Sequence, residues 1–362
     1  QISFQRGKHV ITTLALGPGD AGLWNSVTVG DDGLPVIAYE ANDSLYVAKC
    51  ENVACTAITP SIVESTGPGD LQASIIIGTD GLPLVSYRES SNKNFKIAYC
   101  ETPSCETSTT TTIEATGDVG DHSSIAIGTD GLGIASYYDA TNGDLKVAHC
   151  NNTACTSADL FTIDSTGDVG QHSSIAIGAD GFPIISYYDA TNADLKLAHC
   201  FSITCSGLTT EVIDSAGNVG QSSSITIGID GRALVAYYDA TGNDLKTAHC
   251  SNISCSVSTT ATVARNTGVG NWNSIVIGSD GRGIISYYDS FSGALEVAHC
   301  NDLECSQTTS TDLDQTGNVG LHTSITIGAD GLPLIVYHDV TNRNLKAVHC
   351  SNVHCIPNAR KR

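Results

Sequence analysis

The stretch HSSIAIG occurs at residues 122–128 and again, letter for letter, at 172–178. The residues that follow are repeated as well: YYDAT is found at 137–141 and 187–191, and AHC at 148–150 and 198–200. Such a fixed period indicates a repeat architecture, in which each unit buries its apolar face against its neighbours. The fold therefore depends on what one unit builds and on how many units there are.

The cysteines carry the same period through the whole chain. All 14 fall into seven C-x4-C pairs. The pairs are Cys50/Cys55, Cys100/Cys105, Cys150/Cys155, Cys200/Cys205, Cys250/Cys255, Cys300/Cys305 and Cys350/Cys355. An even count at regular spacing predicts disulfides and an oxidising compartment. We expect each pair to flank a turn between adjacent antiparallel strands, where facing Cα atoms lie about 4.5–5.5 Å apart. Metal binding is the alternative, but Lys49 and Tyr99 replace the preceding histidine in units one and two.

Each unit contains four short segments with the composition of β-strands. In the third unit these are SSIAIG, LGIASYYD, DLKVAHC and DLFTID. The first three are rich in β-branched and aromatic residues. An Asp-Gly hairpin signal separates the first two, and Asn- and Asp-rich turn residues follow the second. Four strands in a unit of about 50 residues are typical of a propeller blade, so the chain is predicted to be an all-β, seven-bladed β-propeller.

The two ends of the chain complement each other. The last unit stops at CIPNARKR without a fourth strand, and GPGD at 17–20 matches GPGD at 67–70, where the fourth strand of unit one ends. We therefore expect residues 9–16 to complete the seventh blade and close the ring. This predicts one domain over 1–362, with blades at about 20–66, 70–116, 121–166, 171–216, 221–266, 271–316 and 321–357 plus 9–16.

Composition limits the classes of partner. The net charge of −21 argues against a nucleic-acid-binding face, which needs a basic surface. No apolar run is long enough to span a membrane, so membrane insertion is not expected. The chain has no Met and starts at Gln1, which is typical of a processed form, and with the cysteines this predicts a secreted or cell-surface protein. Three Asn-x-Ser/Thr sequons, at Asn42, Asn151 and Asn252, are about as many as chance gives.

The chain resembles seven-bladed propellers in general over nearly its whole length, with a disulfide pair in each repeat. It lacks the Trp-Asp of WD40 repeats and the double Gly of kelch repeats. Its TDGLP segments also lack the Ser-x-Asp and the trailing Trp of the Asp-box. The resemblance implies an architecture, and no activity follows from it.

Three positions of the repeat are nearly uniform and are interpreted as scaffold. Seven identical groups around a ring do not suit one asymmetric ligand, and buried hydroxyl and imidazole groups are normally hydrogen-bonded. These positions hold tyrosine (Tyr39, Tyr87, Tyr137, Tyr187, Tyr237, Tyr287, Tyr337), serine (Ser26, Ser74, Ser124, Ser174, Ser224, Ser274, Ser324) and, in five units, histidine (His149, His199, His249, His299, His349).

Function is expected where the copies differ. Two residues before the serine stand Trp24, Gln72, His122, His172, Ser222, Trp272 and His322. The first strand of a blade lines the central channel, so this position is expected at the channel mouth, near Tyr138, Asp139, Tyr188 and Asp189 at the ends of second strands. Aromatic, imidazole and carboxylate groups at a concave mouth favour a polar ligand. Trp24 and Trp272 should form one arc with His322, and tryptophan faces stack on sugar rings.

We interpret the protein as a binding module, lectin- or adhesin-like, that recognises a glycan or another extracellular polymer at the channel mouth. The first alternative is a polysaccharide lyase or glycoside hydrolase that uses the same face, because His with Tyr or paired carboxylates can perform those reactions. No nucleophile elbow or metal triplet supports catalysis, so binding is favoured over an enzyme. The second alternative is a structural, self-assembling component, with Arg360, Lys361 and Arg362 available to join a neighbour.

Two Asx-rich turns raise the question of calcium. The segments DATNGD (139–144) and DATNAD (189–194) offer Asp139, Asn142, Asp144, Asp189, Asn192 and Asp194 as oxygen ligands. Ca²⁺ takes six to eight oxygens, the segments match no EF-hand, and Asx-rich turns form without a metal. The sequence requires no cofactor and leaves Ca²⁺ as an alternative.

Overall fold

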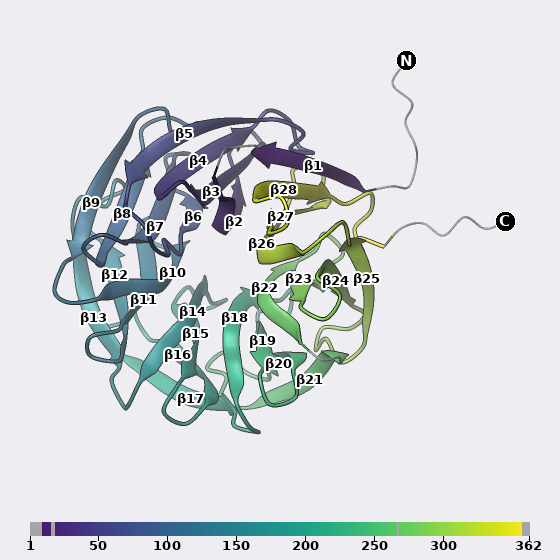
Figure 1. Cartoon of the computed structure of the whole chain (residues 1–362). Coiled ribbons are helices and arrows are strands. Elements are labelled where there is room, and N and C mark those ends of the chain that lie inside the picture. Colours follow the sequence, from purple (N-terminus) through teal and green to yellow (C-terminus); the bar gives the residue numbers. More distant parts are fainter. Residues whose placement is uncertain (1–8, 16–18, 266–267, 357–362) are drawn as a thin grey trace, which may run out of the picture.

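The structure is a computed structural model that describes residues 9–15, 19–265 and 268–356. In these residues 28 strands form seven four-stranded antiparallel sheets, arranged as blades around a common axis (Figure 1). The all-β, seven-bladed propeller that the repeat predicts is therefore confirmed. We number the blades along the chain: blade one contains β2–β5, and blade seven contains β26–β28 together with β1.

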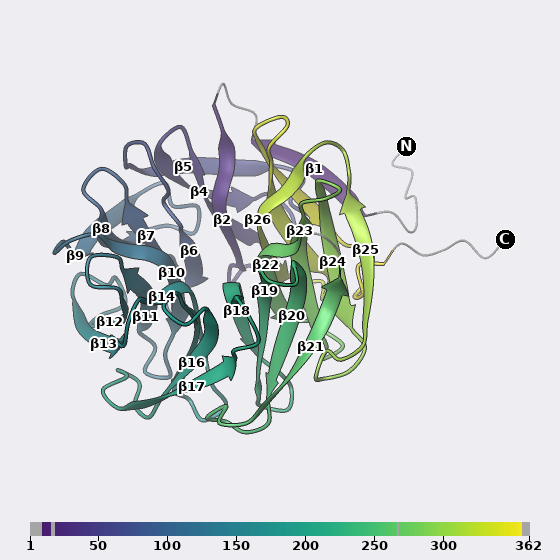
Figure 2. The ribbon, with the colours of Figure 1, turned by 60° about the horizontal axis from the view of Figure 1, so that its bottom comes forward.

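The first strand of each blade lies nearest the axis, which Figure 2 shows for β2, β26 and β18. These innermost strands are β2 (Ala21–Val29), β6 (Ser74–Ile77), β10 (Val119–Ile127), β14 (Val169–Ile177), β18 (Val219–Ile227), β22 (Val269–Ile277) and β26 (Val319–Ile327). The second strands are β3 (Pro35–Ala41), β7 (Pro83–Glu89), β11 (Gly133–Asp139), β15 (Pro183–Asp189), β19 (Ala233–Asp239), β23 (Gly283–Asp289) and β27 (Pro333–Asp339).

The two outer strands complete each blade. The third strands are β4 (Ser44–Cys50), β8 (Asn94–Cys100), β12 (Asp144–Cys150), β16 (Asp194–Cys200), β20 (Asp244–Cys250), β24 (Ala294–Cys300) and β28 (Asn344–His349). The outermost strands are β5 (Ile58–Ser65), β9 (Ser108–Glu114), β13 (Ala158–Asp164), β17 (Leu208–Asp214), β21 (Ser258–Arg265), β25 (Thr308–Asp314) and β1 (Val10–Ala15).

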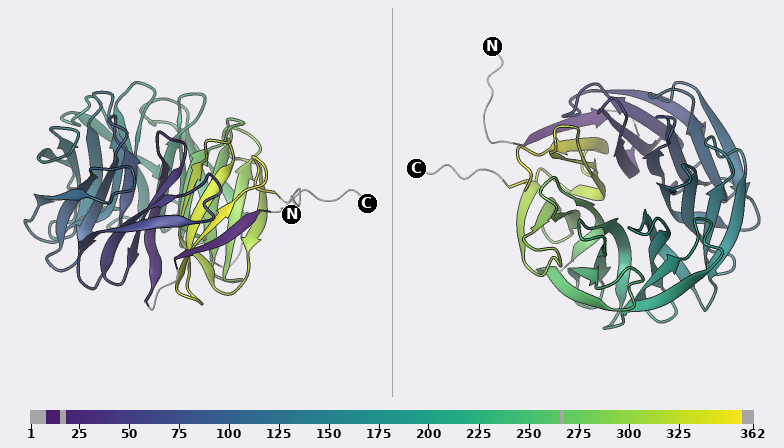
Figure 3. Two further views of the ribbon diagram at one scale, coloured as in Figure 1. Left: turned by 90° about the horizontal axis from the view of Figure 1, so that it is seen from above. Right: turned by 180° about the vertical axis from the view of Figure 1, so that it is seen from behind.

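The N-terminal strand closes the ring. Strand β1 pairs antiparallel with β28, with Val10 opposite His349 and Thr12 opposite Ala347. Figure 3 shows β1, in purple, alongside the yellow strands of blade seven. The expected closure is confirmed, and this pairing covers an edge of β28 that would otherwise expose unpaired backbone groups.

The apolar core lies between blades rather than inside each blade. One core cluster joins Ile134 and Leu145 of blade three to Ile185, Tyr187 and Ala198 of blade four, and each of the other junctions has an equivalent cluster. Both faces of a second strand are covered in this way, and β11 is buried at every position. Because neither face meets water, these strands have near-continuous apolar sequences instead of an alternating pattern.

The uniform serines link the blades in a complete circle. The Ser124 Oγ accepts a hydrogen bond from the backbone N–H of Ile175 in the next blade, at 3.2 Å. The same bond recurs at every junction, and the last one runs from the N–H of Val27 to Ser324 at 3.2 Å. The scaffold interpretation of the serines is confirmed.

All seven predicted disulfides form, with Cα–Cα distances of 4.7–5.0 Å. They join Cys50 to Cys55, Cys100 to Cys105, Cys150 to Cys155, Cys200 to Cys205, Cys250 to Cys255, Cys300 to Cys305 and Cys350 to Cys355. Each disulfide closes a loop of about six residues, which in the chain-entropy model stabilises the fold by about 2 kcal/mol.

The expected position of the second cysteine in each pair is wrong. The two cysteines were expected to face each other across adjacent strands, but the ladder partner of Cys150 is Ala158. The second cysteine lies instead in the turn, in a left-handed conformation with φ between 49° and 57°. This correction applies to Cys55, Cys105, Cys155, Cys205, Cys255, Cys305 and Cys355.

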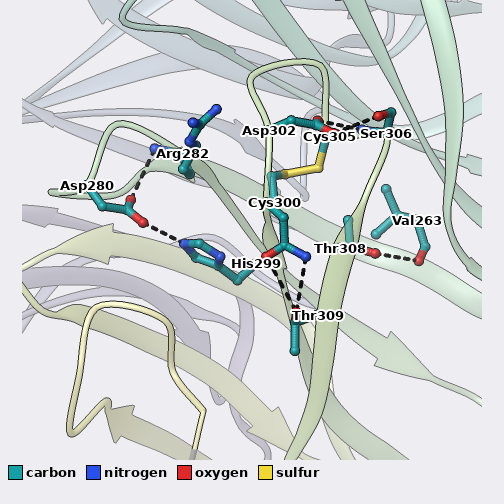
Figure 4. The surroundings of a disulfide bond; sticks show 11 residues. Val263, Asp280, Arg282, His299, Cys300, Asp302, Cys305, Ser306, Thr308 and Thr309 are labelled. Carbon is teal, nitrogen blue, oxygen red and sulfur yellow. Dashed lines mark hydrogen bonds and ion pairs between the residues drawn. A yellow bond between two sulfur atoms is a disulfide. The ribbon is translucent and has the colours of Figure 1, made fainter.

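A tight turn is the physical reason for that difference. The backbone N–H of Cys155 donates to the carbonyl of Asn152 at 3.0 Å, and the same three-residue bond recurs in five other units, at Cys55, Cys105, Cys205, Cys255 and Cys355. The chain therefore bends back before the outermost strand begins, and this brings the sulfur of the second cysteine within bonding distance of the first. Figure 4 shows the arrangement for Cys300 and Cys305.

Each histidine before the first cysteine pairs with the aspartate of its hairpin turn, which agrees with the hydrogen-bonded role that the sequence predicts. The Asp130 Oδ1 accepts the N–H of Leu132 in its own hairpin turn, and its Oδ2 lies 2.8 Å from the Nε2 of His149. In units one and two Lys49 and Tyr99 contact the equivalent aspartates. The Asp-Gly motif therefore anchors the third strand as well as forming the turn.

Blade two departs from the repeat just before its innermost strand, where residues 67–71 are GPGDL and the equivalent residues of blade three are GDVGD. In other blades the innermost strand approaches its neighbour through a glycine: Gly170 has φ +107°, and a Cβ there would lie 2.7 Å from the Cα of Leu145. Asp70 occupies this position in blade two. In this blade the innermost strand β6 has 4 residues, against 9 in β10.

Candidate functional site

The varied position of the repeat lies at a bulge in the innermost strands. All seven residues there have left-handed backbone conformations, with φ between 46° and 54°. In blade three the ladder shifts between Asp121 and Ser124, which face Tyr138 and Ser136. Such a bulge re-aims a side chain, and each non-glycine residue held in this conformation costs about 1–2 kcal/mol. Seven strained residues at one position are therefore a structural feature that the sequence did not reveal.

The bulges direct their side chains into one cavity of about 200 Å³. Its lining contains every residue of the predicted varied column: Trp24, Gln72, His122, His172, Ser222, Trp272 and His322. The cavity is smaller than the roughly 300–1,000 Å³ of pockets that hold drug-sized ligands. Its volume suits one sugar ring or another small polar group rather than a long segment of polymer.

One side of the cavity is an aromatic cluster built from three blades. The ring centroids of Trp24 and Trp272 are 4.8 Å apart, and His322 lies 4.3 Å from Trp24 and 4.1 Å from Trp272. The indole N–H of Trp24 donates to the Oδ1 of Asp70 at 3.1 Å. Asp70, which stands where the other blades have a glycine, thus orients a tryptophan at the cavity.

The other side of the cavity carries two adjacent imidazoles whose planes are tilted by 45°. The ring centroids of His122 and His172 are 4.3 Å apart, and the Gln72 side-chain oxygen accepts the backbone N–H of His122. Burial lowers the pKa of His172 to about 4, and burial followed by repulsion from His338 lowers the pKa of His322 to about 3. These rings face the cavity but are otherwise surrounded by protein, so they are neutral at physiological pH and each offers one donor and one acceptor.

A second set of residues holds the strained backbone, and the sequence analysis missed it. The Ser173 hydroxyl donates to the carbonyl of His122 at 2.8 Å, and the Ser223 hydroxyl donates to the carbonyl of His172 at 2.7 Å. Asn273 donates in the same way to Ser222 at 2.8 Å. The signal was present in the sequence: the position after the varied residue is Ser, Thr or Asn in six of seven blades, at Asn25, Ser123, Ser173, Ser223, Asn273 and Thr323.

The four rim residues that the sequence grouped with this site do not line the cavity. The Tyr138 hydroxyl donates to Asp168 at 2.7 Å, and the Tyr188 hydroxyl donates to Asn218 at 2.9 Å, so each tyrosine contacts the next blade. Asp139 and Asp189 are buried in the turns that follow. The two tyrosine rings lie next to the cavity histidines, with centroids 6.4 Å from His122 for Tyr138 and 6.2 Å from His172 for Tyr188. A direct role of these four residues in ligand binding stays a prediction.

The candidate calcium ligands are bonded within their own turns. Asp139 accepts the backbone N–H groups of Thr141 and Asn142 and the side-chain amide of Asn142. Asp189 accepts the backbone N–H and the side-chain amide of Asn192. Burial and the neighbouring Asp139 carboxylate raise the pKa of Asp144, and burial and Asp189 raise that of Asp194. Calcium binding here stays a prediction. Among the described residues, one group of three His, Cys, Asp or Glu side chains brings its ligand atoms within 4.8 Å: Asp280, His299 and His354.

Comparison with known proteins places the fold. No protein-family model matches the sequence, and a search of curated proteins finds no relative. Among solved structures, a protein of unknown function from Dyadobacter fermentans is similar over 96% of this chain and 99% of its own, with a TM-score of 0.61 and 10% identity. No helix among the described residues has the length and apolar character needed to cross a membrane.

Two enzymes have the same architecture. An ulvan lyase solved with bound -[GlcA(1-4)Rha3S]- is similar over 96% of this chain and 95% of its own, with a TM-score of 0.60 and 10% identity. An α-L-arabinofuranosidase from Fusarium graminearum is similar over 95% of this chain and 97% of its own, with a TM-score of 0.57 and 12% identity. At identities this low, the structural similarity establishes a shared fold and nothing about activity.

Proposed function

We propose that the protein is an extracellular carbohydrate-binding propeller whose site is the cavity formed by the seven bulges. The observation that carries this proposal is the meeting of the chain's two tryptophans across blade seven, in a backbone conformation that costs free energy. Strained residues persist where the surrounding structure holds them for a purpose. Tryptophan faces stack on the apolar faces of sugar rings, and the neutral imidazoles, Gln72 and Ser222 offer hydrogen bonds to hydroxyl groups.

The absence of charged side chains from the described lining bears on the charge of the sugar that binds. None of the described residues in the lining is Lys, Arg, Asp or Glu, and the nearby Asp70 adds a carboxylate behind Trp24. The whole protein carries a net charge of −21, so its field repels polyanions. We therefore infer a neutral sugar residue as the ligand, and acidic polysaccharides should bind weakly.

The same lining favours binding over glycoside hydrolysis. Hydrolysis needs two carboxylates about 5–9 Å apart, and the described lining offers none. Lyase chemistry is the second candidate because His122 and His172 hold free imidazole lone pairs at neutral pH, and because one structural neighbour is an ulvan lyase. A base with a pKa of about 4 is weak, and the lining offers no cation to a substrate carboxylate, so this candidate ranks second.

Two further aspects of the proposal rest on the sequence. Seven disulfides in the structure support a location outside the cell, where such bonds persist. Self-assembly through Arg360, Lys361 and Arg362 stays a prediction, because these residues lie outside the described part of the chain.

Intrinsic tryptophan fluorescence tests the proposal. Titration with neutral oligosaccharides of the gluco-, xylo-, manno- and chito- series should change the emission for at least one series, and polyuronates should not. Trp24→Ala and Trp272→Ala should each weaken binding by about 2–30-fold, corresponding to about 0.5–2 kcal/mol per stacking contact. The matched control is Phe201→Ala, which removes an exposed aromatic side chain from a turn at the other end of its blade.

Two outcomes would overturn parts of this proposal. If a ligand binds equally well to both tryptophan variants, and both variants melt like wild type, the site lies elsewhere. If incubation with acidic polysaccharides produces new unsaturated ends, detected by their ultraviolet absorbance, and His172→Gln abolishes that signal, the lyase assignment replaces binding alone.

A further inference from the structure

The face of the ring opposite the cavity carries one cluster with metal-ligating chemistry. We propose that Asp280, His299 and His354 bind a divalent transition-metal ion, with Zn²⁺ as the best match. Trp272 lies near the start of β22 and Asp280 lies in the turn after its end, which puts the two sites at opposite ends of the strand. His299 lies in β24 of the same blade, and His354 lies in the disulfide-closed turn of blade seven.

The three ligand atoms converge. The Nε2 of His299 is 2.8 Å from the Oδ2 of Asp280, the Nδ1 of His354 is 3.1 Å from that Nε2, and the same Nδ1 is 3.6 Å from the Oδ2. Zn–N and Zn–O bonds of about 2.0–2.2 Å at tetrahedral angles separate neighbouring ligand atoms by about 3.4 Å. The two separations that involve His354 are within about 0.3 Å of that value. The Asp280 and His299 atoms, at 2.8 Å, must move apart by about 0.6 Å to complete one face of a tetrahedron.

The cluster brings the lone pairs of three atoms together around a single shared proton, and this favours an ion. A proton on His299 Nε2 can serve the Asp280 carboxylate, but His354 Nδ1 then competes for the same proton. A proton on His354 Nδ1 serves His299 and leaves a bare imidazole nitrogen facing a carboxylate at 2.8 Å. A metal ion satisfies the lone pairs of all three atoms at once. Neutral imidazole nitrogen and carboxylate oxygen are the ligand types that Zn²⁺ accepts.

Two of the ligands are held before any ion arrives. The Asp280 Oδ1 accepts the backbone N–H of Arg282 at 3.1 Å, which fixes the carboxylate in its turn, as Figure 4 shows together with His299. The His299 side chain is only 5% exposed, whereas that of His354 is 49% exposed and leaves a path for entry. An oriented ligand set of this kind loses little freedom on binding.

None of the preceding blades has a histidine at the position of His354. The residue equivalent to His354 is Ala54, Ser104, Ala154, Thr204, Ser254 and Glu304 in the preceding blades. At those junctions a His–Asp pair such as His249 and Asp230 is complete with one hydrogen bond. The proposed site is thus one substitution within a uniform scaffold, and it joins blade six to the last turn of the blade that closes the ring.

Calorimetric titration of the chelator-treated full chain with Zn²⁺ tests this inference. Wild type should bind one equivalent, and His354→Ala should lower the affinity by more than the roughly 10–100-fold that the loss of an outer-shell partner costs. His149→Ala is the matched control, because it removes an equivalent histidine, paired with Asp130 at 2.8 Å, from a junction where Thr204 stands in place of the third ligand, and it should leave Zn²⁺ binding unchanged. Zn²⁺ should also raise the melting temperature of wild type and not that of His354→Ala.

A gain-of-site variant sharpens the test. Ser254→His places the third ligand beside His199 and Asp180, whose ring nitrogen and carboxylate oxygen are also 2.8 Å apart, so this variant should bind a second equivalent. If Ser254→His does not bind a second equivalent of Zn²⁺, the arrangement of two histidines and one aspartate is not the source of the affinity. Stoichiometric Zn²⁺ binding that survives in His354→Ala, with the chain folded, would overturn the proposal.

Discussion

Seven residues at one position of the repeat share a strained backbone conformation and differ in their side chains. The strain belongs to the bulge, and hydrogen bonds such as those of Ser173 and Ser223 to the preceding blade hold it. Side chains at this position can therefore change without altering the frame: glutamine, serine, tryptophan and histidine all occupy it. One asymmetric cavity is built in this way from a repeated unit.

The buried imidazoles predict an acid-dependent loss of stability. Between about pH 6.5 and pH 4 the unfolded chain protonates His172 and the folded protein does not, because burial lowers its folded pKa to about 4. The free energy of unfolding should therefore fall with pH, by at most about 1.4 kcal/mol per pH unit, less a discount for the part of the ring that faces the cavity. Glu40 and Glu296 act oppositely, since burial raises the pKa of each to about 7 and the folded state takes up their protons first.

A matched variant isolates the histidine. Glutamine occupies the same position at Gln72, so His172→Gln keeps the backbone conformation while removing the titration. Denaturant unfolding at about pH 7 and about pH 5 should show that the variant loses less stability than wild type on acidification. Equal losses in the two proteins would contradict the assignment of a lowered pKa to His172.

At the scale of strands, neighbouring blades are joined by buried triads. The Tyr187 hydroxyl and the Lys196 ammonium of blade four both contact Asp164 at the end of β13 in blade three. Four other junctions repeat the triad, with Glu64, Glu114, Asp214 or Asp314 as the acid. Where the lysine is replaced by Tyr46 or Glu296, the acid position holds Ala15 or Ala264. The two positions change together because a buried charge needs its partner.

This covariation predicts a rescue. Asp164→Ala alone should destabilise the protein by up to about 3–5 kcal/mol, because it leaves the buried Lys196 ammonium with only the more distant Asp189 carboxylate, at 3.9 Å. Adding Lys196→Tyr should recover most of the loss, since it reproduces the combination at the junction of blades seven and one, where Tyr39 and Tyr46 stack at 5.4 Å. Denaturant unfolding of the single and double variants measures the difference. A double variant no more stable than Asp164→Ala would refute the coupling.

At the scale of the whole molecule, the ring is closed by backbone pairing and by contacts between its first and last blades. Strand β1 covers β28, and the N–H of Val27 donates to Ser324 across the same junction. Trp24 contacts Trp272 and His322 beside it. The closure and the cavity therefore share a junction, and loss of closure should disturb the aromatic cluster.

Truncation measures the closure. A chain starting at residue 17 lacks β1, and we expect its melting temperature to fall by many degrees, because an exposed edge of β28 and a broken ring reduce cooperativity. A chain starting at residue 9 keeps β1 and is the control, with a melting temperature close to that of the full chain. If the two truncated proteins melt alike, β1 does not close the ring in solution.

The sequence was enough to predict the period, the number of blades, the seven disulfides and the strand that closes the ring. These follow from local pattern, because strand composition, turn residues and cysteine spacing repeat within each unit of about 50 residues. It also located the varied column, since Trp24 and Trp272 stand out against uniform neighbours. Contacts between blades were decided only by the tertiary structure.

Twist and blade packing, rather than distance along the chain, set which side chains meet. They carried the Tyr138 hydroxyl to Asp168 in the next blade instead of to the cavity. They brought His354 to a pair 55 residues earlier in the chain. The backbone strain could not be predicted either. The bulge imposes a left-handed φ at Trp24 and His172, and neither residue type by itself indicates that conformation.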